Sequence, residues 1–556
     1  MHHSTRTQRF FMAAIGCLGL AFSVQLSAFG QQLPAFPGAE GFGKYTSGGR
    51  GGKVVYVTSL ADDANGETAG TLRWAMKQYP DEPLTVCFAV TGEIRLVKDL
   101  RINRKNYTIA GQTAPGVGIV ITHNKVNCGG SENFIIRNIR FRVGNETASG
   151  DFCKENAFGA ENCSNFILDH CDFGWSAEEN INTFDSHFFT VQYCIVHEGL
   201  YTSGHPKGSR GYGCQWGGSP ATYHHNLLAH NNGRSCRFNG ARNNDRIVYL
   251  DYINNVNFNY YGGSSGCHGG ENTCDDEYYN GRNSGHEVNF VNNYYIKGPN
   301  TTNTPLFVVA DLKRSGATSR GASQWYIHGN VFDGVPAATE DNWSAVNIKT
   351  YTQNEARVDT LIRTKTPYWD CNADSTEFSG LYDFDALAYA AGAFETAEDA
   401  FQTVLDTVGV FPRDHVENRI IEETRTNTYT YSGYKSKKKG IIDVPEDAEG
   451  FYAYPEVTAL SDFDEDGMPD TWEALNGTDP INPDNNTLHA SGYTMLEMYL
   501  DYAMTHKMPM DDGYTPSSEG IQHSEVSIQS TKILRDGQLL IQRGEKVYTV
   551  QGLEIK

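Results

Sequence analysis

The sequence predicts an all-β protein whose main part, roughly residues 35–420, is a right-handed parallel β-helix, followed by a small C-terminal segment and a terminal β-hairpin-like module. Three observations predict this fold. From about residue 130 a short unit recurs in which apolar and polar residues alternate, and period-two alternation indicates strands. Irregular glycine-rich insertions separate the units, as in stacked coils and unlike the uniform blades of a propeller. The 57 glycines against 19 prolines favour turns and short strands over helices.

The recurring unit places a polar residue before its second apolar pair. Successive copies read "NFIIRNIRF", "NFILDHCDF", "FFTVQYCIV", "ATYHHNLLA", "IVYLDYINNV", "EVNFVNNYY" and "QWYIHGNVF". If these polar residues stack at one corner, their side chains hydrogen-bond successive turns. The residues expected in this stack are Asn138, His170, Asn226, Asn255, Asn293 and Asn330. A β-sandwich is the structural alternative, but the Asn-Gly signals of its hairpins are few here.

The N-terminus has the pattern of a secretory signal peptide, which we assign to residues 1–30. Arg6 and Arg9 precede the apolar run "FFMAAIGCLGLAFSVQL", and the small residues "SAFG" stand before Gln31. The apolar run is short for a membrane span. We therefore expect a secreted protein without a membrane span. Removal of Cys17 leaves an odd number of cysteines, which cannot all pair in disulfides.

The charge of the chain limits its partners. A formal net charge of −22 argues against a nucleic-acid partner, because neutralising phosphates needs a basic face. An acidic polymer is not attracted at long range either, so clustered cations within so acidic a chain are informative. The stretch "HHNLLAHNNGRSCRFNG" places Arg234 and Arg237 three positions apart.

We expect the protein to act as a monomer.

The chain changes character after residue 430. "YKSKKKG" forms a basic linker, and residues 462–473, "DFDEDGMPDTWE", match a calcium-loop pattern of oxygen ligands at alternate positions with glycine at the sharp turn. The expected ligands are Asp462, Asp464, Asp466, Asp470 and Glu473. We assign residues 431–525 to this linker and calcium-loop segment. The alternating tail, residues 526–556, resembles the C-terminal tails of secreted Bacteroidetes proteins.

Several motifs together resemble one enzyme family. "FPGAEGFGKYTSGGRGGKVVYVTSLAD", "GTLRWAM", "ILDHCDFGWSAEEN", "HPKGSRGYGCQWGG" and "HHNLLAHNNGRSCRF" are similar, in order and spacing, to the family-1-like pectate lyases, parallel β-helix polysaccharide lyases, in a Bacteroidetes-type form. The motif "FILDH" keeps the family's Asp169 and His170 but not its tryptophan. The resemblance implies that residues 31–430 form the lyase domain.

The resemblance also implies catalytic and substrate-binding residues. Arg234 occupies the position of the family's catalytic base, at the start of an Arg-x-Pro motif in which Cys236 replaces proline. Lys207, in "HPKG", matches the substrate-binding lysine, and His205 of the same motif is a further substrate-binding candidate. Arg237 would bind a substrate carboxylate or act on Arg234 electrostatically. An arginine base needs help, because an arginine is ordinarily always protonated and only burial or neighbouring cations favour its neutral form.

By the same resemblance the catalytic site would hold Ca²⁺. Glu178, or Glu179 in its place, stands where the family carries an acidic ligand, and Asn156 and Asn182 stand where it usually carries aspartates. Asparagine offers a carbonyl oxygen without a charge, so the site is expected to bind calcium weakly until substrate is bound.

These residues suit β-elimination on a uronic-acid polymer. Removal of the C5 proton beside a carboxylate needs a base and a cation that stabilises the developing charge. We therefore expect a secreted pectate lyase that cleaves de-esterified homogalacturonan, or polygalacturonate, with calcium assistance to 4,5-unsaturated products. The alternatives are a pectin lyase that acts on methyl-esterified polymer without calcium and a catalytically decayed, carbohydrate-binding β-helix. A polygalacturonase would need a carboxylate pair that we do not find.

Overall fold

The computed structural model describes residues 33–508 and 530–555 with internal gaps. The gaps are residues 242–245, 261–265, 275–277, 280–281, 302–306, 311–321, 350, 363–393, 536–537, 544–545 and 550–553. The signal-peptide prediction for residues 1–30 lies outside the described residues. Residues up to Met508 belong to one compact unit, and Pro509–Lys556 form a second. No helix of the described ranges is long and apolar enough to cross a membrane.

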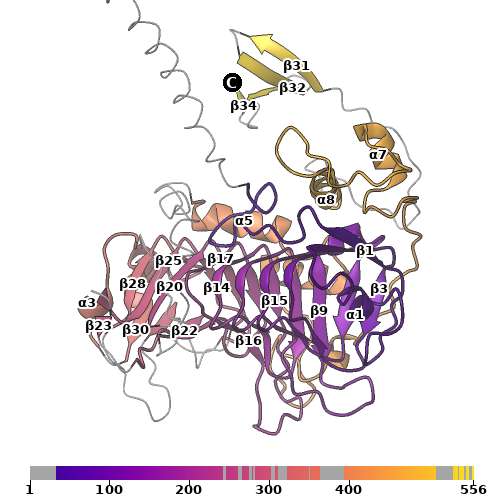
Figure 1. Cartoon of the computed structure of the whole chain (residues 1–556). Helices are drawn as coiled ribbons and strands as arrows, with labels where there is room; N and C mark the ends of the chain where they lie inside the picture. The colour runs from indigo at the N-terminus through magenta and orange to yellow at the C-terminus, as the bar shows by residue number, and fades with distance from the viewer. Residues whose placement is uncertain are drawn as a thin grey trace, which may run out of the picture. The chain divides into compact units, whose positions relative to one another are not determined.

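Three parallel sheets run along the first unit, and after β1 each coil contributes one strand to each sheet (Figure 1). The first sheet contains β1 (Lys53–Val57), β2 (Leu84–Phe88), β5 (Lys105–Ala110), β8 (Glu132–Arg137), β11 (Ser164–Asp169), β14 (His187–Gln192), β17 (Ala221–His224), β20 (Ile247–Ile253), β25 (Gly285–Val291) and β28 (Gln324–His328). The second contains β3 (Gly92–Arg95), β6 (Ile119–Thr122), β9 (Ile139–Gly144), β12 (Asp172–Ser176), β15 (Ile195–His197), β18 (Leu227–Ala229), β21 (Val256–Phe258), β26 (Tyr294–Ile296) and β29 (Val331–Phe332).

The third sheet carries the candidate site. Its strands are β4 (Leu100–Arg101), β7 (Val126–Asn127), β10 (Phe158–Gly159), β13 (Glu179–Asn182), β16 (Tyr212–Trp216), β19 (Arg237–Phe238), β22 (Cys267–Gly269), β27 (Val308–Ala310) and β30 (Val346–Ile348). Buried apolar side chains from all three sheets fill one continuous core. The predicted parallel β-helix is confirmed, and it follows from the alternation, since every second side chain of a strand points inward.

Short helices and a few other elements lie between and after the coils. They are α1 (Leu72–Ala75), α2 (Pro336–Glu340), α3 (Gln353–Ala356), α5 (Ala397–Thr407), α6 (His415–Thr426), α7 (Asp470–Asn476), α8 (Met495–Thr505) and the hairpin strands β23 (Tyr278–Tyr279) and β24 (Arg282–Asn283). The second unit has an antiparallel sheet of β31 (Ser530–Arg535), β32 (Gln538–Arg543), β33 (Lys546–Thr549) and β34 (Glu554–Ile555). The proposed domain boundaries at residues 430 and 525 stay predictions.

The predicted polar stack exists from the middle of the β-helix onward. The Nδ2 atom of each asparagine donates to the Oδ1 atom of the next, at 3.0 Å from Asn226 to Asn255, 3.2 Å from Asn255 to Asn293 and 2.8 Å from Asn293 to Asn330. Asn342 continues the ladder at 3.0 Å. These side chains are buried, so the ladder satisfies amide groups that would otherwise destabilise the core.

The two earlier members of the predicted stack lie in a different column. Asn138 and His170 have φ of 60° and 50°, and the equivalent residues of the next coils, Tyr193 and His225, have 50° and 51°. These residues make the left-handed turn after each strand, a conformation that asparagine adopts more readily than most residues. The following residue continues the inward ladder, where the Asn226 Oδ1 atom accepts from the Cys194 backbone N–H at 2.9 Å. The prediction for Asn138 and His170 was therefore wrong by one position.

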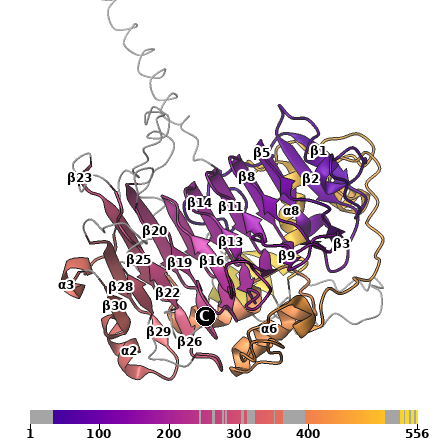
Figure 2. The same cartoon turned by 90° about the horizontal axis from the view of Figure 1, so that it is seen from below.

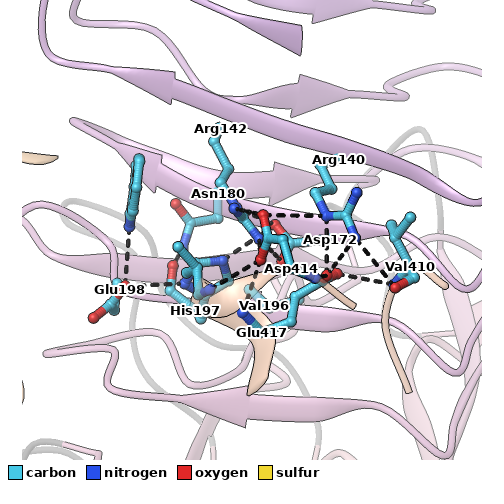
Figure 3. A network of polar contacts seen from close by, with 12 residues as sticks. Arg140, Arg142, Asp172, Asn180, Val196, His197, Glu198, Val410, Asp414 and Glu417 are labelled. Atoms are coloured by element: carbon cyan, nitrogen blue, oxygen red, sulfur yellow. Dashed lines mark hydrogen bonds and ion pairs between the residues drawn. The ribbon is translucent and has the colours of Figure 1, made fainter. Parts of the chain in front are cut away.

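The coils end earlier than residue 420, because α5 and α6 pack as helices on the second sheet. Two arginines of β9 fix α6 there through charges that are almost entirely buried (Figure 3). Arg140 Nη2 lies 2.6 Å from Glu417 Oε2, and Arg142 Nη1 lies 2.6 Å from Asp414 Oδ2. Arg142 also pairs with Asp172 of β12 at 2.8 Å. Removing one member of such a buried pair typically costs about 3–5 kcal/mol, so α6 is firmly attached.

We expect the asparagine ladder to set the stability of the middle coils. In Asn255→Ala, the Asn226 amide, the Tyr223 carbonyl and the Asn293 Oδ1 atom each lose a partner in the core. The free energy of unfolding should fall by about 2–4 kcal/mol, since each buried unsatisfied group costs about 1–3 kcal/mol. The matched control is Asn347→Ala on β30, where the side chain is exposed and a change within about 0.5 kcal/mol is expected. Urea denaturation followed by circular dichroism measures both, and equal stabilities would contradict the role of the ladder.

Candidate active site

The candidate site lies on the outer face of the third sheet, where polar residues of consecutive coils stand in register. Asn182 of β13 pairs with Gln215 of β16, Gln215 with Arg237 of β19, and Arg237 with His268 of β22. Neighbouring parallel strands lie about 4.8 Å apart. Residues separated by 20 to 35 positions in the sequence thus form one polar row. Figure 2 shows β13, β16, β19 and β22 following one another along this sheet.

Arg234 stands in the turn before β19 in a left-handed conformation with φ of 50°, which is uncommon outside glycine and asparagine. Its guanidinium lies over the Tyr212 ring, 4.4 Å from the centroid, and Nη1 donates to Gln215 Oε1 at 2.5 Å. Glu179 is its ion-pair partner. Burial, followed by the positive charge of Arg237, lowers the pKa of Arg234 from 12.5 to about 10. The shift favours the neutral form that a base requires.

Arg237 is held by a carboxylate that the sequence analysis did not identify. Its Nη2 atom lies 2.5 Å from Oε1 of Glu271, a residue that is itself buried. Both arginines line a cleft of about 230 Å³ on this sheet. The cleft is lined by Phe184, Gln215, Arg234, Arg237, Asn239, Gly240, Glu271 and Thr273.

Lys207 and His205 lie in the loop before β16 and meet Glu178. Lys207 Nζ is 3.2 Å from Glu178 Oε1, and the Lys207 side chain is 69% exposed, so a ligand in solvent can reach it. The His205 Nε2 atom lies 3.9 Å from Glu178 Oε2. Arg210 of the same loop binds both oxygens of Glu178. Although burial alone would raise it, hydrogen bonds and charge from Arg210 lower the pKa of Glu178.

The residues predicted to hold catalytic calcium do not form a ready cation site. Both oxygens of Glu178 are taken by Arg210. Asn156 Nδ2 donates to Glu179 Oε2 at 2.9 Å, and Asn182 Nδ2 donates to Glu161 Oε1 at 2.8 Å. Among the described residues, these groups form no set of three carboxylates whose oxygens converge. As arranged, the residues do not fit a calcium ion.

The distal loop, in contrast, gathers carboxylates without cations. Oxygens of Asp462, Asp464 and Asp466 lie within 4.8 Å of one another. Glu473 joins Asp466 in a second such group whose third member, Asp484, the motif did not include. Asp470 belongs to neither group, because its carboxylate faces the backbone N–H of Phe463 at 2.8 Å. Burial, then repulsion by Asp466 and the other carboxylates, raises the pKa of Glu473 to about 8.

Three functional neighbours were missed because their partners are distant in the sequence. Arg210 stands three residues after Lys207 in "HPKGSRG", a segment interpreted only for its lysine. Gln215 and Glu271 reach Arg234 and Arg237 from adjacent coils. The strand register is the signal that could have found Gln215, since it aligns that residue with Arg237.

Comparison with known proteins agrees with the family resemblance. The chain is 30% identical over 503 residues to the probable pectate lyase C of Aspergillus flavus, covering 89% of this chain and 98% of that protein. It is 31% identical over 484 residues to the probable pectate lyase C of Emericella nidulans, covering 85% and 95%. A solved pectate lyase from Bacillus sp. N165 in complex with trigalacturonate aligns with 16% identity and a TM-score of 0.38, over 67% of this chain and 99% of that one. No protein-family model matches the chain.

Proposed function

The chain belongs to the pectate lyase family and is a polysaccharide lyase, and from this premise we propose that it cleaves de-esterified homogalacturonan by β-elimination with Arg234 as the base. The observation that carries the proposal is the cleft in which Arg234, with its pKa lowered to about 10, lies beside Arg237. Relative to an ordinary arginine of pKa 12.5, this lowered pKa favours the neutral form of Arg234.

In the proposed reaction neutral Arg234 takes the C5 proton of a galacturonate unit. The electron pair of the C–H bond forms the C4=C5 double bond, and the C4–O bond breaks, so that the leaving sugar oxygen gains a proton from solvent. Lys207, whose amine is exposed, neutralises the substrate carboxylate and so stabilises charge that develops beside it. Gln215 and the Tyr212 ring hold the guanidinium plane in place.

We propose that calcium, where it assists, binds near Glu178 at the candidate site only together with the polymer. Since Arg210 and Lys207 neutralise Glu178 in the free protein, substrate carboxylates must provide the missing negative ligands. The distal loop, by contrast, suits a structural calcium.

Secretion is proposed from the pattern of residues 1–30, and mass spectrometry of the exported protein tests it by whether the chain begins near Gln31. The monomeric state stays a prediction.

The first test separates elimination from hydrolysis and assigns the base. With polygalacturonate, the wild-type protein should generate product that absorbs in the ultraviolet, as the C4=C5 double bond requires. Arg234→Ala should lower kcat by at least about two orders of magnitude, the lower range for loss of a general base. Arg234→Lys should also be poor, because the planar fork is lost. Arg425→Ala, an exposed arginine on α6, is the matched control. Reducing ends without ultraviolet absorbance would refute elimination, and near-normal turnover of Arg234→Ala would refute the assignment.

A second test follows the pH dependence of kcat/KM. Because Arg234 must be neutral, the rate should rise with pH until the pKa of Arg234, about 10, is passed. The positive charge of Arg237 lowers this pKa, so Arg237→Gln should move the rising limb to higher pH. The negative charge of Glu271 raises the pKa of Arg234, so Glu271→Gln should move the rising part of the pH profile to lower pH. Initial rates from pH 7 to 11 measure both shifts. Shifts in the same direction, or none, would contradict a titrating Arg234.

A third test concerns calcium at the candidate site, measured by calorimetry in an Asp466→Ala background that disables the distal loop. Calcium should bind weakly alone and tightly with a non-cleaved oligogalacturonate, and the two ligands should tighten each other by the same factor. Arg210→Ala should tighten calcium in the free protein at least about tenfold, because Glu178 regains its uncompensated charge. Arg425→Ala again serves as the control. Tight binding without substrate that Arg210→Ala leaves unchanged would contradict the proposal.

A further inference from the structure

The C-terminal segment holds two groups of convergent carboxylates that share one residue. Asp462, Asp464 and Asp466 form the first group, and Asp466, Glu473 and Asp484 form the second. Within each group the ligand oxygens lie within 4.8 Å of one another. Calcium binds oxygens at about 2.3–2.6 Å, so two oxygens on opposite sides of one ion are separated by about twice that distance. The separations within each group agree with this. Each group therefore has the dimensions of a separate cation site.

Buried oxygens without partners point into both groups. Glu473 is fully buried, and neither of its carboxylate oxygens has a hydrogen-bond partner among the described residues. The same holds for Oδ2 of Asp464 in the first group and Oδ1 of Asp484 in the second. In the described part of the chain no lysine, arginine or histidine forms an ion pair with these carboxylates. A buried ionised carboxylate with neither hydrogen bonds nor a counter-charge is strongly unfavourable, so these groups take up either protons or a cation.

The shared residue is held in a bridging position by the backbone. Asp466 Oδ2 accepts from the backbone N–H groups of Asp484 at 3.0 Å and Asn485 at 2.9 Å, and Oδ1 accepts from Met468 N–H at 3.1 Å. Oδ1 retains a further lone pair for a metal, whereas Oδ2 already accepts two hydrogen bonds, so an ion at Oδ2 would share that oxygen with the two N–H groups. Because these contacts fasten residues 484 and 485 to the loop, they also explain how Asp484 reaches the site from beyond α7.

We propose that this segment binds two calcium ions, one in each group, with Asp466 as the bridging ligand and Asp484 as a ligand of the second ion. The summed charge of the carboxylates favours two bound ions over one. When all five carboxylates of the two groups are ionised, as ligands of calcium are, they carry −5, so one Ca²⁺ leaves −3 in a largely buried site, and two leave −1. Glu473 supplies both of its free oxygens to the second ion.

The two ions would fasten the C-terminal segment to the first coils of the β-helix. Tyr56 of β1 donates its hydroxyl to Asp462 Oδ2 at 2.5 Å. Trp472 of α7 and Tyr499 of α8 belong to one buried cluster with Cys87 of β2 and Ala110 of β5. Without cations, the mutual repulsion of the carboxylates opposes this packing. The proposed ions therefore act on stability at a place far along the chain from Arg234, and the inference does not depend on the lyase mechanism.

The decisive measurement is the calcium stoichiometry of chelator-treated and reloaded full-length protein, without polymer, by mass spectrometry of the metal and calorimetric titration. Relative to wild type, Asp466→Ala should lose two ions per chain, and Asp484→Asn and Asp464→Asn one each. The control is Asp470→Asn, which the sequence motif counts as a ligand but which lies outside both groups, and it should lose none. Because the readout is a difference from wild type, any calcium bound at the candidate site cancels.

Three results would overturn the proposal. If Asp484→Asn retained both ions, the assignment of Asp484 to a second site would be refuted. If Asp466→Ala lost a single ion, the role of Asp466 as a bridging ligand would be refuted. Circular dichroism checks that each variant is folded. Glu473→Gln keeps the side-chain shape and one oxygen, so it provides a milder variant in which the second calcium should bind at least about tenfold more weakly. Unchanged titration of that variant would also refute the second ion.

Discussion

The in-register stacking of parallel coils is the constraint on which the rest of the structure depends. Each strand pairs with the strand one coil away, so a residue type at one position meets its equivalents above and below it. Buried polar groups are tolerated only because this repetition gives them partners, as Asn255 has in Asn226 and Asn293. The same repetition builds the site, since it brings Asn182, Gln215 and Arg237 side by side from three coils.

The buried network between α6 and the second sheet extends this constraint toward the site (Figure 3). Asn180, which directly follows Glu178 and Glu179 in the chain, donates to the His197 carbonyl at 2.7 Å and to Asn231 Oδ1 at 3.2 Å. The His197 ring in turn lies 3.1 Å from Asp172. Since Asn231 begins the turn that carries Arg234, these contacts hold that turn next to β13. Rigid placement of this kind is what a base with an unusual backbone conformation requires.

Much of the fold could be predicted from the sequence, because strand alternation and repeated polar positions are local signals. The ladder from Asn226 onward was predicted for that reason, while Asn138 and His170 were misplaced because the left-handed turn shifts the register by one residue. The helices α5 and α6 were missed, because α5 and the first part of α6 lie within residues 35–420, which were all assigned to the β-helix although the last recognised repeat ends at residue 332. The pairing of Glu178 with Arg210 depends on a loop conformation, which neither spacing nor composition specifies.

The two acidic regions of the chain differ in how their charge is compensated, and this difference separates their roles. At the candidate site, Glu178, Glu179 and Glu271 each have an arginine partner, so the free protein has little unpaired negative charge there to attract a cation. In the distal segment, Glu473 is fully buried and has no such partner in the described part of the chain. If the distal segment binds calcium as proposed, a divalent cation at low concentration would fill that segment first. At the candidate site, a polyanion whose carboxylates compete with Glu178 for Arg210 and Lys207 would change the charge balance. On this proposal, calcium would stabilise the fold through the distal segment, and its binding at the candidate site would depend on substrate.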